Sequence, residues 1–223
     1  MSVKIMVTSD FVCPWCFIGN AKLSAAIAML PADITVDLRY LPFELNPGMP
    51  VEGVDRQSFR ARKFGSLAKA QELDARVVAT GREMGLAFNY DRVRLTPNTT
   101  LLHQLMWVAG QEENHRGAGS QSALAARLFS SYFTEGRDLT DRAEVRDIAV
   151  EAGLPSASID AVLNEDAGAG EVEALMRQAR ARGISSIPHI EIDGLALAGA
   201  QPVEILARLI DDAAARQKEG LAR

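Results

Sequence analysis

Residues 9–19 read SDFVCPWCFIG, and this stretch contains both cysteines of the chain, Cys13 and Cys16. Residues 3–7 place apolar side chains at every second position, which is the period of a β-strand with one buried face. From Pro14 onward the apolar positions recur with the period of a helix, and proline suits a first helical turn because its missing N–H is not needed there. The stretch is therefore predicted to be a strand-to-helix junction, with one cysteine at the junction and the other one turn inside the helix.

The flanking sequence extends this junction into an α/β fold. Residues 34–40 alternate again between apolar and polar, so the first part of the chain predicts a strand, a helix and a second strand. Residues 41–50 are rich in proline and are expected to continue neither element. From about residue 55 to residue 182 the patterns are helical almost throughout. Residues 190–198 then predict a hairpin around an Asp-Gly turn, followed by a last helix. The two ends are thus expected to build one sheet, with the helices inserted between them.

Composition and charge exclude several classes of protein. The chain has 223 residues, with 24 Lys and Arg against 29 Asp and Glu, and its formal net charge is −5. This balance argues against a nucleic-acid partner or an anionic membrane surface, since either would favour a basic face. No apolar run approaches the roughly 18 residues that cross a bilayer, and the first residues lack a secretory signal pattern. We therefore expect a cytoplasmic protein that binds neither nucleic acid nor membrane.

The spacing of the two cysteines predicts reversible disulfide chemistry. Residues three apart on a helix are neighbours, with Cβ atoms about 5–6 Å apart, and a small adjustment allows a disulfide. Cys13 lies at the expected helix start, where open N–H groups and the helix dipole favour an anion, so it is the expected thiolate nucleophile. Cys16 shares a helix face with Leu23 and Ile27. It is therefore expected to be buried and to resolve the mixed disulfide.

Other roles for this segment remain to be weighed. A purely structural disulfide is disfavoured in a reducing compartment. The pair could form half of a zinc site, but such sites usually have four ligands, and none of the three histidines has a close partner at ligand spacing. Trp15, between the cysteines, could be a substrate platform or a packing aromatic residue. No metal and no tightly bound cofactor is expected.

The motif and its surroundings resemble a known family. Cys13-Pro14-Trp15-Cys16 within a β-α-β unit, with a later Ile187-Pro188 before a hairpin, resembles the thioredoxin superfamily. The long helical insertion is similar to that of the DsbA family of thiol–disulfide oxidoreductases. Three runs are similar to its FrnE-like subgroup, namely residues 9–19, residues 42–47 (PFELNP) and residues 199–202 (GAQP).

The resemblance implies an α/β architecture, a thioredoxin-like fold with a large all-helical insertion. Residues 1–52 and 183–223 would form a discontinuous thioredoxin-like domain, and residues 53–182 an inserted helical subdomain. The implied activity is that of a thiol–disulfide oxidoreductase or isomerase. Its substrate would be a disulfide-containing protein or a small-molecule thiol.

The resemblance also implies roles for residues around the cysteines. Pro188 is expected to be a cis-proline that faces the cysteines, and the backbone of Ile187 is expected to bind an extended substrate. Pro14 and Trp15 are expected to contribute to substrate binding. His189 is expected to be a strand residue rather than a catalytic base.

Two alternatives stay open: a non-enzymatic role as a chaperone or holdase with an exposed apolar groove, and an enzymatic one indicated by a group with a related fold. In glutathione-dependent isomerases and transferases, the 2-hydroxychromene-2-carboxylate isomerase and kappa-class group, serine replaces the first cysteine. Cys13 departs from that pattern and Cys16 adds a second thiol, so disulfide chemistry is favoured. The enzymatic alternative is a glutathione-dependent enzyme for an aromatic or polyketide-like small molecule. Glutathione could also be a redox co-substrate, and the open N–H groups at residues 199–201 could hold a carboxylate or could simply cap the last helix.

Overall fold

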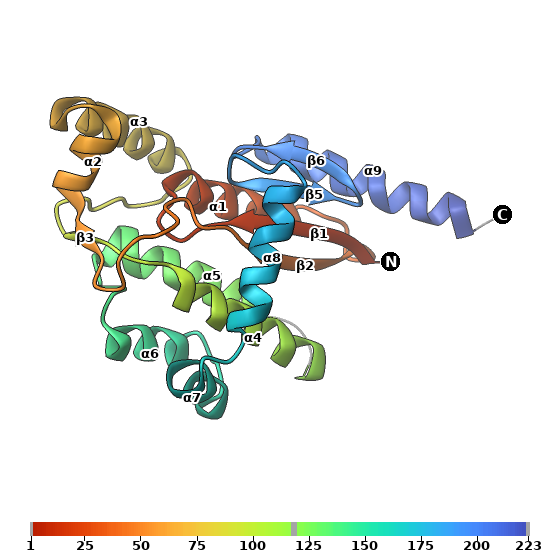
Figure 1. Cartoon of the computed structure of the whole chain (residues 1–223). Helices are drawn as coiled ribbons and strands as arrows, with labels where there is room; N and C mark the ends of the chain where they lie inside the picture. The colour runs from red at the N-terminus through yellow and green to blue at the C-terminus, as the bar shows by residue number, and fades with distance from the viewer. Residues whose placement is uncertain (1, 117–119, 222–223) are drawn as a thin grey trace.

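One mixed sheet brings the two ends of the chain together (Figure 1). The computed structural model describes residues 2–116 and 120–221. In strand order β2-β1-β5-β6, β1 pairs in parallel with β2 and antiparallel with β5, and β5 pairs antiparallel with β6. A separate two-stranded sheet joins β3 to β4. The strands are β1 (Ser2–Ser9), β2 (Thr35–Pro42), β3 (Val54–Asp55), β4 (Leu95–Thr96), β5 (His189–Ile192) and β6 (Leu195–Ala198).

Helices make up most of the remaining chain. α1 packs on α9, which lies on β1 and β5, whereas α4, α5 and α8 contact the edge strand β2 (Figure 1). The helices are α1 (Pro14–Ala28), α2 (Arg56–Phe64), α3 (Leu67–Glu83), α4 (Thr100–Arg116), α5 (Ser120–Ser130), α6 (Arg142–Glu151), α7 (Ser156–Glu165), α8 (Ala169–Ala181) and α9 (Val203–Leu221), and α5 continues into a π-helical turn, η1 (Ser131–Glu135). None of the described helices is long and apolar enough to span a membrane.

Two details of the strands differ from the sequence expectation. β2 continues through residues 41 and 42, where the sequence predicts no strand. Pro42 stands opposite Ser9 at the end of the parallel pairing, and the next donor to Ser9 is the N–H of Phe43, at 3.2 Å from the Ser9 oxygen. A proline is tolerated at this place because it terminates an edge strand and its missing N–H is not needed. β3 and β4 have two residues each, too few to leave a periodic signal in the sequence.

The predicted hairpin is confirmed. Asp193 and Gly194 connect β5 to β6 with φ angles of 48° and 87°. A two-residue turn with both residues in the left-handed region matches the twist of the flanking strands, and Asp-Gly is a preferred pair for it. The turn sets the register between β5 and β6, and a separate antiparallel pairing places His189 opposite Thr8 and Ile190 opposite Val7 of β1.

Aromatic side chains link the first helix to the helical region. Phe17, which follows the second cysteine, stacks on Phe129 of α5 and on Phe133 of η1, with ring centroids 5.5 Å and 5.8 Å apart. Phe11 also contacts Phe129, at 5.2 Å between centroids. Buried side chains from the sheet and from the helical region belong to one continuous core. The division into domains at residues 52/53 and 182/183 stays a prediction.

Candidate active site

The two cysteines lie at the junction that the sequence predicts. Cys13 is the N-cap of α1: it has extended backbone angles, and its carbonyl oxygen accepts hydrogen bonds from the N–H groups of Cys16 (3.0 Å) and Phe17 (3.3 Å). The N–H of Cys13 donates to the carbonyl oxygen of Asp10 at 3.1 Å. Pro14 occupies the first helical position, where it interrupts no hydrogen bond. Cys13 therefore lies at the positive end of the helix dipole.

The two thiols differ in their surroundings, although both are free and buried. Burial raises the pKa of the Cys16 thiol well above its ordinary value, and the hydrogen bond and charge of Cys13 act in the same direction. Ser9 and the backbone of Asp10 oppose this shift. Cys16 thus holds its proton. Cys13 is only 4% exposed, but it lines a cavity through which a substrate can reach it.

Pro188 packs against this junction from the other end of the chain. The Ile187–Pro188 peptide bond is cis, as expected, and the Cys13 thiol donates a long hydrogen bond to the Ile187 carbonyl oxygen, with 3.9 Å between sulfur and oxygen. Gly19, one turn after Cys16, leaves room for the Pro188 ring, since a β-carbon at Gly19 would lie 2.9 Å from Cγ of Pro188. No local sequence pattern predicts this role for Gly19.

A cavity of about 490 Å³ opens beside Cys13. The start of α1, residues 185–187, α2 and α3 surround it, and Trp15, 41% exposed, lies on its wall together with Pro14 and Ile187. The structure thus brings together the four predicted site residues Cys13, Pro14, Trp15 and Ile187, whereas Cys16 and Pro188 do not line the cavity. The other aromatic lining residues are Phe59, Phe64, Tyr90, Tyr132 and Phe133.

Basic side chains on α2 line the same cavity, and the sequence analysis does not identify them. Arg56 stacks over the ring of Tyr90 at 4.1 Å from its centroid and pairs with Asp74 of α3 at 2.8 Å. Arg60 pairs with the same carboxylate. The run of basic residues within 56–63 is the available sequence signal, because residues at helical spacing share one face of α2. Burial and the neighbouring Arg60 lower the pKa of Lys63, and Cys13 and Asp10 act in the opposite direction, so Lys63 lies within electrostatic reach of the cysteine.

A buried acid–base pair lies behind the cysteines. The side chains of Asp10 and His103 are 1% and 3% exposed, and Oδ1 of Asp10 lies 3.6 Å from Nε2 of His103. Neither of these two atoms has a hydrogen-bond partner. The other carboxylate oxygen of Asp10 accepts a 2.7 Å hydrogen bond from the N–H of Leu45. Asp10 thus connects the loop after β2 to the start of α1, because its side chain binds the Leu45 N–H and its carbonyl oxygen binds the Cys13 N–H.

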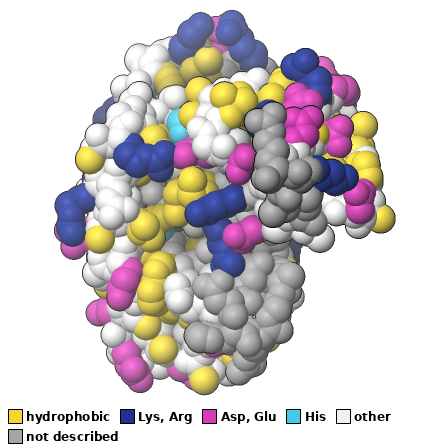
Figure 2. Space-filling view, turned by 90° about the vertical axis from the view of Figure 1, so that its right-hand side faces the viewer, with side chains coloured by type: hydrophobic (Ala, Val, Ile, Leu, Met, Phe, Trp, Pro, Cys, Tyr) yellow, Lys and Arg dark blue, Asp and Glu magenta, His cyan; other side chains and the backbone are white. Residues whose placement is uncertain are grey.

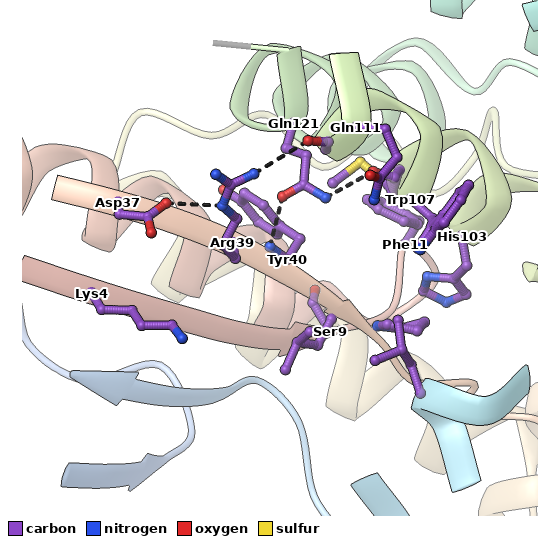
Figure 3. Close-up of a pocket in the computed structure, with 15 residues that line it drawn as sticks. Lys4, Ser9, Phe11, Asp37, Arg39, Tyr40, His103, Trp107, Gln111 and Gln121 are labelled. Carbon is purple, nitrogen blue, oxygen red and sulfur yellow. Dashed lines mark hydrogen bonds and ion pairs between the residues drawn. The ribbon is translucent and has the colours of Figure 1, made fainter. Parts of the chain in front are cut away.

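A second cavity, of about 350 Å³, lies where α4 and α5 meet the edge strand β2, and neither cysteine lines it (Figure 3). Several of its polar groups bind one another or neighbouring backbone atoms. Arg39 pairs with Asp37 at 2.8 Å and donates to the Gly110 carbonyl oxygen at 3.3 Å. The Gln121 side chain accepts from the N–H of Tyr40 at 3.0 Å and donates to the Met106 carbonyl oxygen, as Figure 3 shows. These contacts hold the helices on β2.

Two further predicted features are placed away from the cavity. Residues 199–201 do not line it; Ala200 packs toward α1 and its carbonyl oxygen accepts from Lys22 Nζ at 3.4 Å. His189 is the first residue of β5, as expected, and its Nε2 lies 3.5 Å from Oε1 of Glu191. Among the residues that the structure describes, no group of three or more His, Cys, Asp or Glu could hold a metal ion.

A Cys-Pro-Trp-Cys helix start that packs beside a cis-proline, together with a four-stranded mixed sheet, defines a thioredoxin-like protein with an inserted helical region. A model of the DSBA-like thioredoxin domain family matches residues 4–211, and the chain belongs to that family. Members of the family are thiol–disulfide oxidoreductases, which act on disulfide or thiol substrates.

The chain is similar to several known proteins over nearly its whole length. The uncharacterized protein YwbO of Bacillus subtilis is 26% identical over 216 residues, which is 95% of this chain and 98% of that protein. A probable DsbA oxidoreductase from Streptomyces coelicolor has 29% identity and a TM-score of 0.80 over 95% of this chain and 89% of its own. A 2-hydroxychromene-2-carboxylate isomerase shares the fold, with a TM-score of 0.70, 15% identity and 98% of both chains covered.

Proposed function

We propose that this protein is a cytoplasmic thiol–disulfide oxidoreductase or isomerase in which Cys13 is the nucleophile and Cys16 the resolving thiol. The observation that carries the proposal is the asymmetry of the two thiols. Cys13 caps the helix and lines the cavity, whereas Cys16 is enclosed one turn deeper and its pKa is raised by burial. One thiol is accessible to a disulfide and the other keeps its proton until a mixed disulfide forms.

The proposed cycle follows from this asymmetry. The Cys13 thiolate attacks a substrate disulfide and releases one substrate thiolate. Cys16 then attacks the Cys13 sulfur, its proton goes to the departing sulfur, and the Cys13–Cys16 disulfide forms. A thiol reductant returns the pair to the dithiol form. Because the cytosolic glutathione poise keeps most such pairs reduced, net reduction or isomerisation of substrates is favoured over net oxidation.

Substrate binding is assigned to the surface next to Cys13. Pro14 and Trp15 lie on the cavity wall, and Ile187 offers its main chain beside the nucleophile. An extended segment could pair with this main chain in the manner of an added strand. Pro188 packs behind Ile187 against Gly19 and keeps this wall in place. Glutathione is proposed only as a redox co-substrate, with no bound cofactor or metal.

Insulin reduction in the presence of dithiothreitol tests the proposal. The wild type should accelerate precipitation of the insulin chains. The rate with Cys13→Ser should be lower by a factor of roughly 100 or more, because the nucleophile is absent. Cys16→Ser should accumulate a mixed disulfide that is visible by mass. Undiminished turnover in Cys13→Ser, with both variants folded by circular dichroism, would exclude the proposed cycle.

The cavity itself favours a second candidate function, a glutathione-dependent isomerase or transferase for an aromatic or polyketide-like small molecule. The cavity next to Cys13 has an aromatic lining, and its volume of about 490 Å³ is typical of small-molecule sites. This candidate predicts that catalysis requires glutathione and that Cys16→Ser keeps full activity. A dependence of turnover on both thiols would exclude it.

A further inference from the structure

The cavity beside Cys13 is lined by basic residues and by no acidic ones. Arg56, Arg60, Lys63 and Arg76 contribute to its wall, and no Asp or Glu is among the described residues that line it. The chain as a whole is acidic, with a net charge of −5. On the face that Figure 2 shows, basic and acidic side chains are interspersed rather than segregated. The cationic wall of the cavity thus contrasts with the net negative charge of the chain.

The positive charges of the cavity wall are only partly balanced by acidic side chains of the protein. Arg56 and Arg60 share one carboxylate, that of Asp74, and these three side chains are only 9%, 16% and 13% exposed. Two buried cations thus share one anion. Arg76 pairs with Glu72 on the surface. Lys63 Nζ donates a 2.5 Å hydrogen bond to Oδ1 of Asn46, a neutral group.

Two buried polar atoms of this wall have no hydrogen-bond partner. They are Nε of Arg60 and the hydroxyl oxygen of Tyr90. A buried donor on a cation that is left without a partner costs free energy, so such groups are normally satisfied by protein, water or ligand. Burial lowers the pKa of the Arg60 guanidinium, and Asp74 only partly opposes this. An anionic group in the cavity would complete the charge balance of the two guanidinium groups that share Asp74.

The size and remaining lining of the cavity define the rest of the ligand. A volume of about 490 Å³ accommodates a small molecule rather than a folded protein. Aromatic rings from Trp15, Phe59, Phe64 and Tyr132 also line the wall, and the rings of Phe59 and Phe64 lie under the cations of Lys63 and Arg60. Such surfaces bind apolar or aromatic groups. The nucleophile Cys13 belongs to the same wall.

We infer that the substrates of the proposed dithiol reaction are small disulfides that carry carboxylate groups on an apolar or aromatic body. This inference rests on the proposed function. The Cys13 thiolate attacks one sulfur of the disulfide RSSR, forming a Cys13–SR bond and releasing RS⁻. Cys16 then displaces the second thiol as RSH, supplying its own proton. RSSR is thereby reduced by two electrons, the cysteine pair is oxidised by two, and a dithiol reductant restores it.

Charge preference can be measured with three disulfides of different charge. They are the dianionic aromatic dithiobis(nitrobenzoate), the uncharged aromatic dithiodipyridine and the dicationic cystamine. Stopped-flow rates of the reduced wild type are divided by the rates of free mercaptoethanol with the same disulfide, which removes differences in intrinsic reactivity. The normalised rate for the dianion should exceed that for the uncharged disulfide by about tenfold at low salt, and cystamine should be slowest. The preference should shrink at 0.5 M salt through screening.

Variants test which cations are responsible. Lys63→Gln and Arg60→Gln should each lower the normalised preference for the dianion by about threefold to fivefold, the size expected for one charge several ångströms away. Dividing each rate by the same variant's rate with dithiodipyridine removes any change in the reactivity of the Cys13 thiol that the lost charge causes. Arg208→Gln, an exposed position on α9 outside the cavity, is the matched control and should leave the preference unchanged. Lys63 lies at the rim, so its replacement keeps the inference testable if Arg60→Gln fails to fold.

The outcomes separate this inference from the proposed function. If the wild type reacts with dithiodipyridine and closes its disulfide but shows no preference for the dianion, the proposed dithiol cycle stands and the inference fails. The inference also fails if Arg208→Gln lowers the preference as much as Lys63→Gln. If dithiodipyridine never yields the Cys13–Cys16 disulfide, the proposed function itself fails.

Discussion

Gly19 and Pro188 are in direct contact: the α1 residue one turn after Cys16 leaves the space that the ring of Pro188 occupies, and a β-carbon at Gly19 would lie 2.9 Å from Cγ of that ring. Glycine is unfavourable inside a helix by about 1 kcal/mol relative to alanine, so its presence here needs a packing reason. The contact supplies it. This contact fixes the segment of Ile187 and Pro188 beside the start of α1, where the two cysteines lie.

Gly19→Ala should therefore destabilise the protein by about 1–3 kcal/mol, because the rigid proline ring and the backbone of α1 must move apart. Urea unfolding measures this. The matched control is Gly170→Ala in α8, where an added β-carbon meets nothing within 4 Å. That variant should be neutral or slightly stabilised through helix propensity. Equal stability of Gly19→Ala and the wild type would show that the contact is not tight.

The buried pair of Asp10 and His103 should be energetically coupled. Their facing atoms lie 3.6 Å apart with exposed fractions of 1% and 3%, so removal of either leaves the other uncompensated in a low-dielectric interior. A double-mutant cycle of Asp10→Asn and His103→Gln, followed by urea unfolding, should give an interaction energy of at least about 1 kcal/mol. Additive effects of the two substitutions would contradict the coupling.

The stability of the reduced protein should fall with rising pH because of Cys16. Its pKa is raised in the folded state above the ordinary 9.0, chiefly by burial, so the unfolded chain releases the proton first. The stabilisation is complete below pH 9 and is lost as the pH rises above it, with a slope of at most about 1.4 kcal/mol per pH unit.

The measurement compares the reduced wild type with Cys16→Ser by urea unfolding between pH 8 and pH 10. The range ends there because Tyr132, whose pKa is raised to about 12 chiefly by burial, contributes in the same direction at higher pH. The wild type should lose more stability than the variant across this range. Parallel pH profiles would show that burial of Cys16 does not control its titration.

Asp74 should be essential for the folding of α2 against α3. It is the carboxylate that both Arg56 and Arg60 contact, and all three are largely buried. Asp74→Asn leaves two buried cations without an anion and should cost about 3–5 kcal/mol in unfolding free energy. Glu173→Gln is the control, since Glu173 pairs with Arg177 on the surface with exposed fractions of 69% and 61%. That change should be undetectable.

Local patterns predict a large part of this fold. The strand-to-helix junction at Cys13, the burial of Cys16 beside Leu23 and the Asp193–Gly194 hairpin are all confirmed. Each depends on residues within a few positions of one another, where periodicity and turn chemistry are decisive. The prediction that the second strand ends before Leu41 and Pro42 is wrong. Whether a strand tolerates proline depends on its place in the sheet, and β2 lies at an edge.

The cavity illustrates what local patterns miss. Arg56 and Arg60 lie on one helix and their carboxylate partner Asp74 on the next, while Tyr90 comes from the segment after it. The basic run on α2 is visible in the sequence, but a basic helix face is usually turned to solvent. Only the packing of α2 on α3 and on the small β3–β4 sheet places this face on the cavity beside Cys13.

The amino-acid sequence alone determined the chemistry at the start of α1: two thiols three residues apart, one at a helix end and one inside, follow from short-range spacing and the properties of Pro14. Only the tertiary structure decided which distant residues lie next to these two thiols. Ile187, whose carbonyl oxygen accepts from Cys13, lies 174 residues further along the chain. Gly19 contacts Pro188, and the cations reach the cavity from α2. Such contacts are set by the packing of the whole core, which short-range patterns do not encode.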